Sequence, residues 1–112
     1  MKKVPKILPE CYCDTLLVML LMQVVPNHQT NGISGVLSAL EIGFSKQKAV
    51  GIIDNDKANK NLKTKFFGKF LKQKEDNNLI LLKHPERLNY LIMLSPALEK
   101  FILIAAKECE FF

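Results

Sequence analysis

Cysteine, long apolar runs and histidine are scarce in this sequence, and each scarcity excludes a class of protein. The three cysteines, Cys11, Cys13 and Cys109, are odd in number and show no paired metal-ligand spacing. This usage argues against a disulfide framework and favours a reduced, cytoplasmic compartment. The longest apolar run, residues 16–25, contains Gln23 and reaches about half of the ~20 residues that a membrane helix needs. We therefore expect neither a disulfide scaffold nor a membrane protein.

Histidine occurs twice, at His28 and His84, and neither residue has a partner at metal-ligand spacing. Both lie in polar segments, so we expect solvated loop histidines and no histidine metal site. The chain also lacks internal repeats, linkers and low-complexity segments, which predicts a single domain over residues 1–112. Its apolar content of 48% argues against disorder, and its formal charge of +5 permits a polyanionic partner.

Apolar runs and breaker residues divide the chain into strands and helices. Strands are expected at residues 4–11, 49–53, 79–82 and 88–94, and helices at 16–25, 33–44, 57–74 and from Ser95 onward. Asp14 and Thr15 offer N-cap chemistry to the first helix. Segment 27–32 sits where a further strand would fit, but its composition does not support one. The order predicts an α/β fold: a small, mostly parallel sheet with helices on both faces and a strand pair near the C-terminus.

Four acidic side chains stand at the expected ends of two strands. Asp54 and Asp56 follow the apolar run 49–53, Glu10 ends the first apolar stretch, and Asp14 lies four residues further on. The carboxyl ends of parallel strands meet at one edge of a sheet, where open α/β sheets collect ligands. Carboxylate oxygens at such an edge are the ligands that a hard divalent cation prefers. The pattern therefore predicts a metal site.

Each acid also has a structural alternative. Asp14 could serve as a helix N-cap alone, Asp54 could be a turn residue with Asp56 as an N-cap, and Glu10 could be solvated at a strand end.

Two segments carry a resemblance to a known family. Residues 8–14 (LPECYCD) resemble the first motif of the Toprim (topoisomerase–primase) domain, and residues 51–56 (GIIDND) resemble its second, a strand that ends in Asp-x-Asp. The length and the strand–helix order also fit that domain. One departure is that Toprim domains usually have glycine after the glutamate, whereas this chain has Cys11. A side chain there could crowd an approaching phosphate.

The resemblance implies a Mg²⁺- or Mn²⁺-dependent nuclease, a hydrolase that acts on DNA or RNA. Glu10 would act as a general acid or base, Asp54 and Asp56 would hold the metal, and Asp14 would be a further ligand. Two other functions stay open. One is a non-catalytic Toprim-like binding or interaction module, favoured by the Cys11 departure. The other is a phosphoryl-accepting receiver-like domain, although receivers place their acidic pair after the first strand and a single aspartate after a later one.

Lysines follow the Asp-x-Asp pair directly. Segment 57–74 contains seven lysines and no acid, and its apolar residues fall near helical spacing. We interpret it as a basic amphipathic helix whose first lysines, Lys57, Lys60 and Lys63, contact nucleic-acid phosphates. The alternative is a solvated helix face. The chain ends in Phe111-Phe112, which leaves open a homo-oligomer or a partner domain in contact with the C-terminal end.

Overall fold

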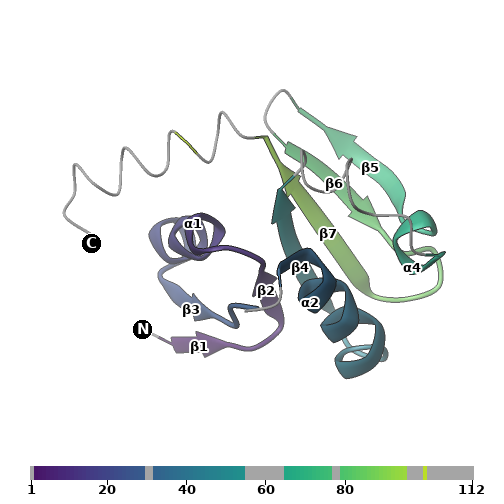
Figure 1. The fold of residues 1–112 in the computed structure, drawn as a ribbon, viewed down its shortest axis with the longest axis horizontal. Helices are drawn as coiled ribbons and strands as arrows, with labels where there is room; N and C mark the ends of the chain where they lie inside the picture. The colour runs from purple at the N-terminus through teal and green to yellow at the C-terminus, as the bar shows by residue number, and fades with distance from the viewer. Residues whose placement is uncertain (1, 30–31, 55–64, 77–78, 96–99, 101–112) are drawn as a thin grey trace.

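The computed structural model describes residues 2–29, 32–54, 65–76, 79–95 and 100. Their elements are, in chain order, β1 (Lys2–Val4), β2 (Ile7–Pro9), α1 (Tyr12–Met22), β3 (Val24–Pro26), α2 (Gly32–Ser38), the π-helix η1 (Ala39–Gly43), β4 (Ala49–Asp54), α4 (Lys65–Gly68), β5 (Leu71–Glu75), β6 (Leu79–Lys83) and β7 (Asn89–Leu94). The fold is α/β, as the sequence predicted (Figure 1). The helix expected from Ser95 onward lies outside the described residues except at Lys100, which is helical.

The main sheet is mixed, which corrects the expectation of a mostly parallel one. Its order is β2-β4-β7-β6-β5. β2, β4 and β7 are parallel to one another, whereas β6 pairs antiparallel with both β7 and β5. The antiparallel half arises because β6 and β7 are joined by a short turn, which can only connect antiparallel strands. The predicted strand pair near the C-terminus is this hairpin.

Helical segments cover both faces of the sheet, because side chains along each strand point alternately to the two sides. In β4, Ile53 packs in a cluster with Val36 and Leu40 of the α2–η1 segment. Its neighbour Ile52 packs in a second cluster with Val18 of α1. Each fully buried aliphatic side chain of this kind stabilises the fold by about 1.5–3 kcal/mol. The predicted helix at residues 33–44 is thus present, although its second half is π-helical.

Gly51 allows α2 to lie close to the centre of the sheet. A Cβ atom built on Gly51 would lie 2.5 Å from Val36 Cγ1, 2.9 Å from Leu91 Cδ2 and 3.2 Å from Leu40 Cδ1. The first two separations are below any real Cβ contact, so even a methyl group at residue 51 would push the helix from the sheet.

The first helix begins and ends earlier than the sequence pattern suggested. α1 ends at Met22 because Gln23 adopts a left-handed conformation, with φ of 53°, and donates its N–H to the Met19 carbonyl at 3.0 Å. The following residues form β3, which pairs in parallel with β1 in a separate two-stranded sheet. Beyond β3, the N–H groups of Asn27 and Gln29 donate to the carbonyls of Ile7 and Pro9. Segment 27–32 therefore begins by lying along β2, despite its polar composition.

The predicted basic helix at residues 57–74 is wrong over its described part. Only α4 is helical there, and the chain then forms β5 at the edge of the sheet. All five β5 residues are exposed, and the β5–β6 register shifts between Lys72 and Lys74. The apolar spacing suggested one helix because Phe66 and Phe70 are both buried. However, Phe66 belongs to α4 and Phe70 to the turn before β5.

His84 is buried, not solvated as the sequence suggested, with 2% of its surface exposed. Its ring lies against those of Phe66 and Phe70, and its Nδ1 accepts a hydrogen bond from the Glu86 backbone N–H at 3.1 Å. Burial, followed by the charge of Arg87, lowers the pKa of His84 below its ordinary value. His28 is exposed, as predicted. Among the described residues, none of the helices has the length and apolar character needed to span a membrane.

Candidate metal centre

Glu10 and Asp54 meet at one edge of the sheet because β2 and β4 are parallel neighbours in register. Pro9 pairs with Ile52, and the Glu10 N–H continues the ladder by donating to the Ile52 carbonyl at 2.9 Å. The side chain of Glu10 then turns towards the end of β4, where its Oε1 accepts a hydrogen bond from the Asp54 backbone N–H at 3.3 Å. The sequence therefore placed these two acids correctly relative to each other.

Asp14 lies in the first turn of α1, but it is not the N-cap. The helix begins at Tyr12, and its N-cap is Cys11, whose Sγ accepts a hydrogen bond from the Asp14 backbone N–H at 3.4 Å. Thr15 also does not cap; its hydroxyl donates to the Cys11 carbonyl at 2.9 Å. The carboxylate of Asp14 is thus close to the positive end of the α1 dipole.

The three acids are buried, which excludes a solvated role for each of them. Glu10 is 5%, Asp14 0% and Asp54 8% exposed. Glu10 is therefore not a solvated strand end, and Asp54 is a paired strand residue opposite Leu94 and not a turn residue. Burying carboxylates together costs free energy through desolvation and mutual repulsion, and hydrogen bonds or cations must offset that cost.

Cys11 joins the acids as a fourth group at this edge. One ligand atom each from Glu10, Cys11 and Asp14 lie within 4.8 Å of one another, which is close enough to surround a single cation. The set combines hard carboxylate oxygens with a soft sulfur atom, so its donor chemistry suits Mn²⁺ or Zn²⁺ as well as Mg²⁺. The sequence identified Cys11 as a departure from a family pattern, but not as a neighbour of the ligands.

Gly32 is a further residue at the site that sequence reasoning missed. It adopts a left-handed φ of 66° at the start of α2, and a Cβ built on it would lie 3.9 Å from Glu10 Oε2. A side chain on Gly32 would therefore lie in van der Waals contact with the second carboxylate oxygen of Glu10. A glycine directly before an apolar helical run was the signal that could have drawn attention to it.

Four predicted site residues, Asp56, Lys57, Lys60 and Lys63, lie outside the described residues. The structure thus brings Glu10 and Asp14 together with Cys11, and Glu10 contacts the backbone of Asp54, whose carboxylate is not part of that three-residue group.

Comparison with known proteins does not assign the chain to a family. No family model matches the chain, and searches of curated proteins and of solved structures found no match.

Proposed function

We propose that this protein is a Mg²⁺- or Mn²⁺-dependent enzyme that cleaves nucleic-acid phosphodiester bonds, of the Toprim nuclease type. The observation that carries the proposal is the contact between Glu10 and Asp54 at the carboxyl ends of two parallel strands, with Asp14 buried beside Glu10. The formal charge of +5 suits a polyanionic substrate, DNA or RNA.

The residues divide into two chemical roles. Asp54, Asp56 and Asp14 would hold the cation, because Mg²⁺ and Mn²⁺ prefer carboxylate oxygens and need only one or two of them beside substrate phosphate and water. A bound cation supplies positive charge against the charge that develops on a phosphate under attack. Glu10 would exchange a proton with the attacking water or the leaving oxygen. Its Oε1 accepts a hydrogen bond from the Asp54 N–H, and its Oε2 lies on the side of Gly32.

A second candidate function is a non-catalytic binding module on the same fold. The specific observation that favours it is the position of Cys11, whose side chain caps α1 beside Glu10. A side chain at this point would hinder a phosphate from approaching the carboxylates. Under this proposal the edge would bind a cation or a partner without turnover.

The change in stability on adding metal tests whether the metal site exists. With Mg²⁺ or Mn²⁺ at 100 times its dissociation constant, binding should raise the unfolding free energy by about 2.7 kcal/mol, and thermal unfolding would measure the rise. Asp54→Asn should abolish the rise, because it removes a ligand charge. Glu41→Gln is a matched control, since it neutralises an exposed acid on η1. An equal rise in all three proteins would refute a metal site at Asp54.

Hydrolysis separates the two candidate functions. On single-stranded and duplex DNA and RNA with metal present, Glu10→Gln should lower the cleavage rate by about 10²-fold or more, because it removes the proton-transfer group. Because Glu10 also lies among the possible ligands, the metal-induced rise in melting temperature is measured for this variant too. Metal binding without cleavage in the wild-type protein would reject the enzyme in favour of the binding module.

A further inference from the structure

His84 is a buried titratable side chain that the proposed nuclease activity does not use. It opens the turn between β6 and β7, and its backbone N–H donates to the carbonyl of Asn89, the residue that pairs with Ala49 at the start of β4. The carboxylates of the candidate metal centre lie where β4 ends. His84 therefore lies at the opposite edge of the sheet and needs an explanation of its own.

A hydrogen bond fixes the protonation state of the His84 ring. The backbone N–H of Glu86 donates to His84 Nδ1 at 3.1 Å. A ring nitrogen accepts a hydrogen bond only through a lone pair, so Nδ1 carries no proton and the ring is neutral, with its proton on Nε2. Protonation would make Nδ1 a donor that faces another donor. The observed arrangement of the turn is therefore compatible only with neutral His84.

Burial and the surrounding charges also oppose a proton on His84. Burial lowers the pKa of His84 most, and the charge of Arg87 in the same turn comes next. Lys83, and Lys69 from the segment between α4 and β5, act in the same direction. Glu86 is the one acid that raises the pKa of His84, and its effect is smaller than that of Arg87. Cations thus prevail over carboxylates around this ring.

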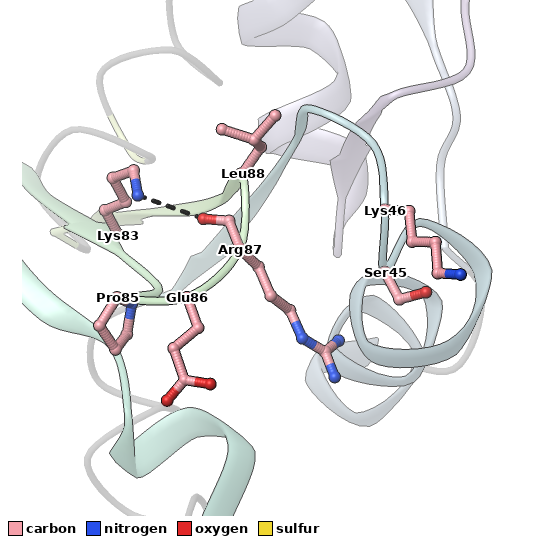
Figure 2. Close-up of a pocket in the computed structure, with 7 residues that line it drawn as sticks. All are labelled: Ser45, Lys46, Lys83, Pro85, Glu86, Arg87 and Leu88. Atoms are coloured by element: carbon pink, nitrogen blue, oxygen red, sulfur yellow. Dashed lines mark hydrogen bonds between the residues drawn. The ribbon is translucent and has the colours of Figure 1, made fainter.

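The turn that His84 opens is tied to two neighbouring helices. Within the turn, Lys83 Nζ donates to the carbonyls of His84 and Arg87, at 3.1 and 3.2 Å. Figure 2 shows the second of these bonds, and the Arg87 side chain extending from the turn. Arg87 Nη1 donates to the Glu41 carbonyl of η1 at 2.9 Å, and its guanidinium lies 5.2 Å from the centre of the Phe66 ring of α4. Movement of the turn would therefore disturb both helices.

The short helix α4 depends on this turn for its packing. It has four residues, and so short a helix has little stability of its own. Its buried Phe66 lies against the rings of His84 and Phe70, with centroids 5.5 and 5.2 Å away. Departure of the His84 ring would leave a cavity beside Phe66, and a cavity destabilises the groups that line it. We therefore expect α4 to loosen whenever the turn opens.

We propose that His84 is a proton-sensitive latch: its neutral ring holds the β6–β7 turn (residues 84–88) against α4, and its protonation releases the turn and α4 as one local unit. A proton from solvent binds Nδ1, the ring moves into water, and the Glu86 N–H exchanges its acceptor for water. A histidine in water has a pKa of about 6.5 and the closed form binds the proton less tightly, so acid favours the open form. The latch is independent of the proposed nuclease activity.

Amide hydrogen exchange from pH 7.5 to 5.0, expressed as protection factors, tests the latch. The N–H of Glu86 and the N–H of Phe70, which donates to the Phe67 carbonyl at 3.1 Å, should lose protection together as the pH falls. Between about pH 6.5 and the folded-state pKa of the histidine, the loss should approach about tenfold per pH unit, because opening binds one proton. The N–H groups of Ile52 and Ile53 in β4, between β2 and β7, should stay protected.

His84→Asn separates the proton from the hydrogen bond. An asparagine side-chain oxygen can accept from the backbone N–H two residues further on, as Nδ1 does in His84, but it does not titrate. Protection of the Glu86 N–H in this variant should therefore be independent of pH over the same range. His28→Asn is the matched control, because it replaces the other histidine of the chain, which is exposed, and it should keep the wild-type pH dependence.

Three outcomes would overturn the latch. Protection of the Glu86 N–H that does not change with pH in the wild-type protein would show that the turn does not open with acid. Equal pH dependence in the wild-type protein and in His84→Asn would assign the opening to another group. Parallel loss of protection at Glu86 and in β4 would mean that the whole domain unfolds. The first and third comparisons use the wild-type protein alone, so they do not depend on the folding of a variant.

Discussion

The two edges of the sheet carry opposite charge, and the direction of the chain explains the sign of each. At the edge where β2 and β4 end, the buried carboxylates of Glu10 and Asp14 lie beside the N-terminus of α1. At the edge where β4 begins, Arg87 donates to a carbonyl of η1, the helix whose C-terminal end precedes β4. Helix N-termini favour anions and C-termini favour cations. The dipoles of α1 and η1 therefore favour the sign of charge that is found at each edge.

A larger side chain in β4, the strand that runs between the two edges, should have the largest effect on stability. Gly51→Ala should lower the unfolding free energy by about 1–3 kcal/mol, because the added methyl group overlaps Val36 and Leu91. Urea unfolding measures the change. Gly43→Ala is the control, since a Cβ there meets nothing within 4 Å. A loss below about 0.5 kcal/mol in Gly51→Ala would show that α2 can move away without cost.

At the acidic edge, two substitutions separate the effect of the Glu10 charge on stability from the effect of its hydrogen bond. Glu10→Gln keeps an oxygen that can accept from the Asp54 N–H but removes a charge from a crowded edge. Glu10→Ala removes both and leaves that buried N–H without its acceptor. In chelator, Glu10→Ala should be less stable than Glu10→Gln by about 1–2 kcal/mol. Equal stability of the two variants would mean that the 3.3 Å hydrogen bond contributes nothing.

The smallest effect is expected at the basic edge, in the dependence of stability on pH. Because the pKa of His84 is lowered in the folded protein, the unfolded chain binds the proton more tightly. Stability should therefore be full above the ordinary pKa of about 6.5 and fall as the pH drops below it, until the folded-state pKa is passed. Melting temperatures from pH 7.5 to 5.0 measure this slope. His84→Gln should flatten it, whereas His28→Gln, at an exposed site, should not. Parallel curves for all three proteins would exclude His84 as the cause.

The sequence could predict the acidic edge because strong signals specified it. The run before Asp54 is continuously apolar and partly β-branched, which identifies a central strand, and parallel order then places Glu10 beside it. The start of α1 was wrong because cysteine is not among the common N-cap residues, so Asp14 and Thr15 were favoured as caps. The hydrogen bond from the Asp14 N–H to the Cys11 sulfur depends on local geometry that residue preferences do not encode.

The basic edge could not be predicted, because its residues are distant in sequence and the outermost strand, β5, lacks a buried face. β5 has five exposed residues, so it shows no alternation of apolar and polar positions. His84 is flanked by lysine, proline, glutamate and arginine, which is typical of a solvated turn. Its burial depends on Phe66 and Phe70, which lie more than ten residues away in the chain.

The irregular edge strand β5 bears on how the folded protein behaves at high concentration. A strand that ends a sheet offers unpaired backbone groups to strands of other molecules, which is a route to aggregation. In β5, the shift of register between Lys72 and Lys74 breaks the regular ladder, and the exposed lysines would have to approach the side chains of any added strand. Pairing of β5 with strands of other molecules is therefore disfavoured. The lysines that made this segment resemble a basic helix in the sequence thus reduce aggregation of the folded chain.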